Sequence, residues 1–328
     1  MNARAAAVVT GVGLAMPGNC SAADLLSRHA EGAEPVDPAA LIGRKGLRYK
    51  DRATQLAMCA ADAALRDARL LGADGLALEP ESIGVVVASN FGNLDTITKI
   101  VATIANEQGA QGLSPMDTPN ASSNVIASTV AIRFGLRGPN LTVCNGATSG
   151  LDGIRWASGL MAAGRADRIL VIGVEPDTDA VRRLLDDRPP IDGAVAIVVE
   201  TPTAARRRHA PAQARIGTTV RAGGTAQALG MLGDQAPAAW YAPEDGAATP
   251  PDSTVAGIPR HDLTQRWGIA SGALGVLQCA AAIGSFAAGC PGPVYVVAGG
   301  DGDDASAALV LLGPEPAAPA APESEVAP

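Results

Sequence analysis

The sequence predicts an α/β protein in which helices and strands are stacked in layers. Apolar runs of strand length alternate along the chain with segments of helical periodicity. Residues 83–88 form a continuous apolar run rich in valine, which is typical of a strand buried on both faces. With 328 residues, 47% of them hydrophobic, the chain is long enough to bury a sizeable core.

Each predicted element follows from its local pattern. The segment 50–70 places Ala, Leu and Met on one side and charged residues on the other, as in an amphipathic helix. The same periodicity predicts further helices at residues 93–108, 122–134, 148–163 and 268–289. Short apolar runs predict strands at residues 5–11, 83–88, 141–144, 168–174, 194–200, 294–298 and 307–312.

Three stretches carry weaker patterns. Residues 201–221 give a mixed signal, and residues 225–259 are rich in Gly, Ala and Pro with few long apolar runs, so we expect loops there. Residues 313–328 are rich in Pro, Ala and Glu and predict a disordered tail.

Composition excludes several classes of function. The net charge of −8 and the absence of an evident basic cluster argue against binding to nucleic acid. Five dispersed cysteines without a CxxC pair suit a reducing cytosol, and three histidines are too few for a His-rich metal centre. The apolar stretch 5–15 lacks the cleavage site of a signal peptide. The stretch 268–289 is too weakly hydrophobic for a membrane-spanning helix. We therefore expect a cytoplasmic protein with no metal, no cofactor and no membrane contact.

Two motifs invite a chemical interpretation. Gly11 and Gly13 follow the first strand, as in a dinucleotide-binding turn, but the third glycine and the acidic residue are missing, which favours a structural exit from the strand. Residues 141–151 (LTVCNGATSGL) predict a strand, a tight turn and a helix, a geometry that exposes a nucleophile at a helix N-terminus. The tip of this turn is Ala147, which has no group to attack with.

The segment around this turn resembles the one that carries the active cysteine of β-ketoacyl synthases. The resemblance rests on RFGLRGPNLTV at residues 133–143 followed by SGL at 149–151, and weaker similarities extend it from about residue 5 to 312. It implies a thiolase-like fold of five layers, α-β-α-β-α, built from two similar halves. These are expected at residues 1–200 and, in shortened form, at residues 201–312.

The resemblance also shows which catalytic groups are missing. The cysteine nucleophile of the family falls on Ala147, the helix-opening histidine on Ile269, and the nearest match to its lysine is Thr264. Residues 241–248 occupy the approximate place of the family's HGTGT loop and contain no histidine. Acyl transfer requires a thiolate, and decarboxylation requires donors that stabilise an enolate, so no independent activity is expected.

Loss of the catalytic groups with retention of the scaffold resembles the chain length factor, or ketosynthase β subunit, of type II polyketide synthases. That resemblance implies a heterodimer with a catalytic ketosynthase, an acyl carrier protein that delivers the chain, and a tunnel between the subunits. This chain departs from the chain length factors of aromatic pathways, which favours a highly reducing, polyene-forming system. The interface is expected at residues 141–144 and 119–132. The tunnel-gating positions of the family fall on Asp95, Thr98, Ala102 and Pro119.

A different class of function stays open from the residues alone. Cys144 lies three residues before the turn tip and could serve a divergent acyltransferase or condensing enzyme if His261 approaches it in the fold. The structural alternative is that Cys144 packs inward as a small hydrophobe. A nucleotide-dependent oxidoreductase is the weaker enzymatic alternative, because it depends on the incomplete glycine motif.

Overall fold

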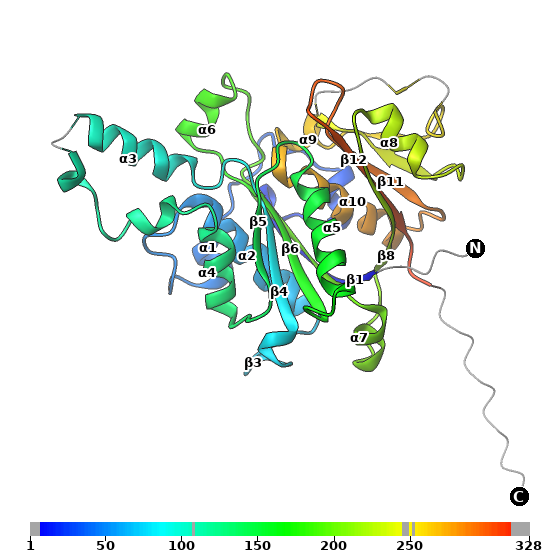
Figure 1. Ribbon diagram of the computed structural model, residues 1–328, viewed down its shortest axis with the longest axis horizontal. Helices are drawn as coiled ribbons and strands as arrows, with labels where there is room; N and C mark the ends of the chain where they lie inside the picture. The colour runs from blue at the N-terminus through cyan, green and yellow to red at the C-terminus, as the bar shows by residue number, and fades with distance from the viewer. Residues whose placement is uncertain (1–6, 107–108, 245–248, 251–252, 316–328) are drawn as a thin grey trace, which may run out of the picture.

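The computed structural model describes residues 7–106, 109–244, 249–250 and 253–315 (Figure 1). Its described strands form a ten-stranded sheet in the order β10-β9-β11-β12-β8-β1-β7-β6-β4-β5, beside the small hairpin β2 (Leu71–Gly72) and β3 (Gly75–Leu76). The α/β class is thus confirmed.

Residues 7–200 form five strands of this sheet, from β1 to β5 in its spatial order, together with their helices. The strands are β1 (Ala7–Ala15), β4 (Ile83–Ala88), β5 (Asn140–Val143), β6 (Arg168–Glu175) and β7 (Gly193–Glu200). The helices are α1 (Pro38–Ile42), α2 (Arg52–Asp67), α3 (Leu94–Asn106), α4 (Val125–Phe134), α5 (Ser149–Ala162) and α6 (Asp179–Leu184).

The remaining residues repeat this plan with shorter elements. The strands are β8 (Ala214–Ala222), β9 (Ala239–Tyr241), β10 (Arg260–His261), β11 (Val294–Ala298) and β12 (Ser306–Leu312). The helices are α7 (Pro202–Arg207), α8 (Thr225–Met231), α9 (Thr264–Trp267) and α10 (Leu274–Ala287).

The two sets of strands have the same topology. From the junction outward the order is β1-β7-β6-β4-β5 in one set and β8-β12-β11-β9-β10 in the other. The inner pairings are antiparallel and the outer two are parallel in both sets. This repetition supports two similar halves, while the boundary expected at residue 200 stays a prediction.

Successive side chains of a strand point to opposite faces of the sheet, and this alternation creates the layers. On β6, Leu170 and Ile172 pack in the cluster that contains α2 and α4, whereas Ile169 and Val171 pack in the cluster of α5 and α10. In the second set of strands, Val296 on β11 faces the α5–α10 cluster and Val297 faces that of α8. Helices therefore lie outside and between the two sets of strands, which gives the expected five layers.

Close helix packing depends on glycine at two positions. A Cβ on Gly150 of α5 would lie 2.9 Å from the backbone nitrogen of Gly275 on α10. In β1, a Cβ on Gly13 would lie 2.2 Å from the carbonyl oxygen of Ala60 on α2. Gly11 and Gly13 are inside β1, which continues to Ala15, so the expected exit from the strand is wrong and no dinucleotide-binding turn exists there.

Several other expectations need correction. Residues 225–259 were expected to be loops, yet the described part contains α8 and β9, because Trp240 and Tyr241 are fully buried against distant elements. Residues 201–221 contain α7 and β8, whose arginines and threonines obscure the apolar pattern. The late helix begins at Leu274 rather than at residue 268, because positive φ angles at Gly268 (94°) and Ser271 (42°) interrupt it. Of the expected tail, residues 316–328 lie outside the described residues.

Candidate functional site

The turn between β5 and α5 places Ala147 where the nucleophile was expected. Gly146 has a φ of 66°, a conformation that favours glycine, and Ala147 follows it half-buried before α5 begins. The hydroxyl of Ser149 donates to the carbonyl of Gly146 (2.8 Å), and the amide side chain of Asn145 donates to Asp152 Oδ2 (2.7 Å). The turn is therefore held in the predicted geometry and presents a methyl group at its tip.

The position expected to carry histidine is part of an apolar cluster. Ile269 is buried with Val181 and Leu185, and Phe91 and Leu94 pack against them. The side chains of this cluster cannot form a hydrogen bond with an imidazole. Thr264, at the lysine position, donates its hydroxyl to Asp262 Oδ1 (2.7 Å) at the start of α9 and has a local capping role.

Glu244, in the segment predicted to occupy the place of the family's HGTGT loop, lies against the Ile269 loop. Glu244 Oε1 accepts hydrogen bonds from the backbone nitrogens of Ala270 (2.7 Å) and Ser271 (3.2 Å). The Tyr241 ring is fully buried, and its hydroxyl lies 3.0 Å from Ser285 Oγ. Residues 245–248 lie outside the described residues. The carboxylate of Glu244 thus accepts the hydrogen bonds of these two backbone nitrogens. Among the described residues, no histidine contacts them.

Two residues that sequence reasoning missed connect these loops. The side-chain amide of Asn90 donates to the carbonyl of Gly146 (2.9 Å) and to Ser271 Oγ (2.8 Å). Glu175 is fully buried and accepts from the backbone nitrogens of Asn90 (2.7 Å) and Gly272 (3.1 Å). Burial raises the pKa of Glu175 to about 8. Both residues follow or end parallel strands, and that position was the available signal, since parallel strands place ligand sites at their carboxyl ends.

Cys144 is exposed, so the expectation that it packs inward is wrong. It comes directly after β5, an edge strand, and this leaves one side of the residue uncovered. Partial burial and then the charge of Glu175 raise the pKa of the Cys144 thiol, which opposes the thiolate that a nucleophile needs. His261 packs against the Tyr241 ring at a centroid distance of 5.1 Å, and burial followed by Arg266 lowers its pKa.

The predicted gate residues lie at one end of the molecule. Asp95, Thr98 and Ala102 are exposed on α3, and Pro119 is exposed on the 3-10 helix η5 (Thr118–Ala121). Helix α3 extends to the left edge of the molecule in Figure 1. Three large apolar side chains of α3 are also exposed: Ile97 (37%), Val101 (60%) and Ile104 (47%). Helix α3 therefore carries an apolar surface that nothing covers in the described chain.

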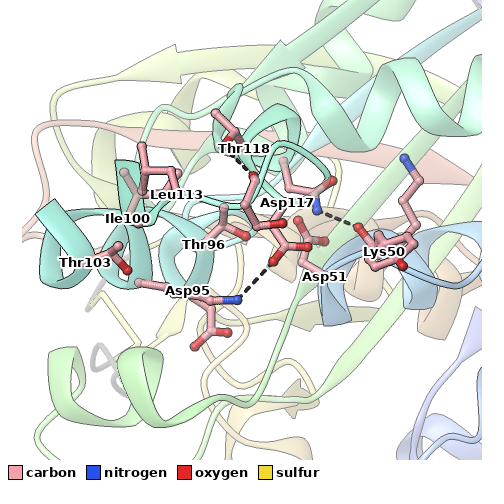
Figure 2. Close-up of a pocket in the computed structure, with 14 residues that line it drawn as sticks. Lys50, Asp51, Asp95, Thr96, Ile100, Thr103, Leu113, Asp117 and Thr118 are labelled. Carbon is pink, nitrogen blue, oxygen red and sulfur yellow. Dashed lines mark hydrogen bonds and ion pairs between the residues drawn. The ribbon is translucent and has the colours of Figure 1, made fainter. Parts of the chain in front are cut away.

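A cavity of about 470 Å³ lies between α3 and the segment that leads to η5. Figure 2 shows Thr96, Ile100 and Thr103 of α3 beside Leu113 and Thr118. The two walls are joined by an ion pair between Lys99 and Asp117 (3.0 Å) and by a hydrogen bond from the Asn93 amide to the carbonyl of Ala121 (2.9 Å). Asp95 lines the cavity, whereas Thr98, Ala102 and Pro119 are outside its lining.

The expected interface segments are accessible. Strand β5 is at the edge of the sheet and, among the described strands, pairs with β4 alone. Ile132, near the end of α4, is 82% exposed. An open strand edge and a large exposed aliphatic side chain are features that proteins usually cover.

Neither a metal site nor a membrane-spanning helix is present among the described residues. They contain no group of three His, Cys, Asp or Glu side chains arranged to hold a metal ion. Nor does any helix in this part of the chain have the length and apolarity needed to cross a bilayer.

Comparisons with known proteins agree with this geometry. Residues 27–183 match the N-terminal domain of β-ketoacyl synthases. This match covers just under half of the chain. It is 34% identical over 138 residues to 3-oxoacyl-[acyl-carrier-protein] synthase 2 of Vibrio cholerae, an alignment that covers 41% of this chain and 31% of that protein.

A longer alignment and a solved structure extend the likeness. The chain is 30% identical over 266 residues to the tetracenomycin polyketide synthase ketoacyl synthase alpha subunit of Streptomyces glaucescens, an alignment that covers 64% of this chain and 61% of that protein. These alignments span from about a third to three fifths of the curated relatives. The structure of the ishigamide ketosynthase/chain length factor superposes with a TM-score of 0.76 at 24% identity, covering 94% of this chain and 99% of that chain. This likeness confirms the thiolase-like fold.

Proposed function

We propose that this chain is a non-catalytic, cytoplasmic chain length factor that pairs with a catalytic ketosynthase in a type II polyketide synthase. The observation that carries the proposal is the combination of Ala147 at the turn tip with Ile269 inside an apolar cluster. A condensing enzyme needs a nucleophile and polar groups at these two positions. The scaffold that would present them is intact, which favours a structural role in a complex.

The accessible surfaces support a partner subunit. Strand β5 offers unpaired backbone groups along its edge, and Ile132 and the apolar side of α3 are exposed. Obligate partners bury large apolar surfaces of this kind. The named similarity to a ketosynthase/chain length factor structure supports the same assignment. The partner we propose is a ketosynthase, and the chain would reach the pair on an acyl carrier protein.

The exposed side of α3 suits a tunnel wall in that complex. Asp95, Thr98 and Ala102 are accessible to a partner, and Thr98 and Ala102 are small enough to leave room for a growing chain. We therefore propose a fairly long product and, because the turn carries alanine, a highly reducing system that forms polyenes. Pro119 contributes from η5, which is joined to α3 through Asp117.

Co-expression with a catalytic ketosynthase of a type II polyketide synthase from the same organism tests the pairing. Native mass spectrometry of the purified complex is expected to show one copy of each chain. A soluble homodimer that ignores the ketosynthase would contradict the proposal. In that case acylation of Cys144 by an acyl-carrier-protein thioester is the next measurement, because it separates the divergent acyltransferase from an inactive protein.

Replacement of Ala102 by Trp tests the gate in the reconstituted pair. The indole is expected to narrow the tunnel, so that the product distribution shifts to fewer elongation rounds in mass spectrometry. Ala162→Trp is the matched control, because it adds the same ring at an exposed alanine on another helix, α5. Unchanged products from the Ala102 variant, with the heterodimer intact, would refute the gate assignment while leaving the pairing in place.

A further inference from the structure

The first turn of α3 anchors this helix on the protein. No residue of α3 is buried in the described chain. Farther along the helix, Lys99 forms an ion pair with Asp117, but Lys99 is exposed, and exposed pairs add little stability. At the beginning of the helix, Leu94 packs against the cluster of Ile269 together with Phe91 of the preceding loop. The position of α3 therefore depends on how this loop is fixed.

A buried carboxylate fixes the loop before α3. Glu175, the last residue of β6, accepts hydrogen bonds from the backbone nitrogens of Asn90 (2.7 Å) and Phe91 (2.9 Å). It also accepts from Ser89 Oγ (3.2 Å) and from the backbone nitrogen of Gly272 (3.1 Å). Four donors thus converge on one fully buried side chain. A shift of the loop would leave buried polar atoms without partners, which is costly.

The side chain of Asn90 joins the same loop to the turn that carries Ala147. Its amide nitrogen donates to the carbonyl of Gly146 (2.9 Å) and to Ser271 Oγ (2.8 Å). Ser271 has a φ of 42°, a strained conformation that persists only where the surrounding structure imposes it. The two loops where the catalytic cysteine and histidine were expected are therefore both joined to the start of α3.

We propose that Glu175 and Asn90 are positioning residues that hold α3 against the turn of Ala147 and thereby determine the length of the product. The inference rests on the proposed function, since the gate residues of α3 limit the chain only inside a heterodimer. The geometry gives the loop leverage over the gate. Ala102 follows Leu94 on α3 by about 12 Å along the helix axis. A tilt of about 10° at the first turn would therefore move Ala102 by about 2 Å, enough to open or close space for a methyl group.

Asn90→Asp tests the proposal with two measurements. The variant keeps the shape of the side chain but replaces the amide donor by an oxygen that faces two other oxygens. In hydrogen-exchange mass spectrometry of this chain alone, residues 94–106 are expected to exchange about tenfold faster. In the heterodimer reconstituted with its ketosynthase, the ratio of the two main product lengths is expected to change at least about twofold, with the one-to-one stoichiometry retained in native mass spectrometry.

Glu175→Gln is the second variant. It replaces one carboxylate oxygen by an amide nitrogen, which cannot accept from Phe91 or Ser89. We expect it to change α3 exchange and product length, and we expect Glu175→Asp, which keeps two acceptor oxygens, to change them less. A residue that only stabilises the fold would lower the yield of the complex without changing the ratio of product lengths.

Gln213→Glu is the matched control, because it also removes an amide donor. Gln213 lies between α7 and β8 and donates to Asp67 Oδ2 (2.6 Å), and α7 and α3 lie on opposite sides of Figure 1. This variant is expected to leave exchange in α3 and the product ratio unchanged.

Each other outcome has one meaning. Unchanged exchange in residues 94–106 of both the Asn90→Asp and the Glu175→Gln variants would overturn the positioning role. Faster exchange with unchanged products, or equal changes in Gln213→Glu, would also overturn it. Failure of the unsubstituted chain to pair with a ketosynthase would instead refute the proposed function, and exchange in the chain alone would still test the contacts that hold α3.

Discussion

The crossing of α5 and α10 leaves no room for a side chain at Gly150, and this gives a sharp prediction. In Gly150→Ala the new Cβ would lie 2.9 Å from the nitrogen of Gly275, 3.0 Å from its Cα and 3.0 Å from the nitrogen of Val276. All three atoms are backbone, so the two helices must move apart. Overpacking of this kind costs about 1–3 kcal/mol of the free energy of unfolding.

Gly159 on the same helix is the control. A Cβ there meets no atom within 4 Å, so Gly159→Ala is expected to stabilise the protein by about 0.5–1 kcal/mol through helix propensity alone. Urea unfolding followed by circular dichroism measures both variants. The difference between them isolates the steric term, and we expect Gly150→Ala to be less stable than Gly159→Ala by at least about 1 kcal/mol. Equal stability of the two variants would refute the close crossing of α5 and α10.

Three further predictions concern ionisable groups. Burial raises the pKa of Glu175 from 4.5 to about 8, so between these pH values the folded state keeps a proton that the unfolded state releases. The free energy of unfolding is therefore expected to fall as pH rises from 4.5 to 8. Glu175→Gln should remove this pH dependence, as measured by urea unfolding at several pH values. The raised pKa of Cys144 predicts that iodoacetamide alkylates this exposed thiol more slowly at pH 7 than it alkylates free cysteine. Glu200 is fully buried and pairs with Arg208 and Arg168, so Glu200→Gln is expected to destabilise the fold by about 3–5 kcal/mol in urea unfolding; a loss below 1 kcal/mol would show that the arginines find other partners.

Elements with strong local patterns were predictable from the sequence. The strands at 83–88 and 294–298 have the predicted bounds, because a strand buried on both faces is a continuous apolar run. Strands β8 and β9 were not predicted. In β9 the burial of Trp240 and Tyr241 depends on α8, α10 and β11, and a local window does not contain those partners. Tertiary packing, rather than local propensity, determines such elements.

The candidate site was predictable only in part. The turn and the alanine at its tip follow from residues 141–151, since a strand, a tight turn and a helix are contiguous in sequence. The roles of Asn90, Glu175 and Glu244 depend on contacts between segments as much as 181 positions apart, as in the Asn90–Ser271 hydrogen bond. Local sequence therefore located the turn and its alanine but not the groups that surround them.

The apolar cluster around Ile269 has a consequence for how this chain could change over time. A single Ile269→His substitution would bury an imidazole among Val181, Leu185, Phe91 and Leu94, and leaving its nitrogens unsatisfied would cost about 1–3 kcal/mol. A single Ala147→Cys substitution would supply a thiol without that imidazole. Neither step alone produces a working catalyst, and the first one destabilises the fold. Under the proposed function, an active enzyme would therefore require repacking around Ile269 together with a new thiol, and no single mutation supplies both.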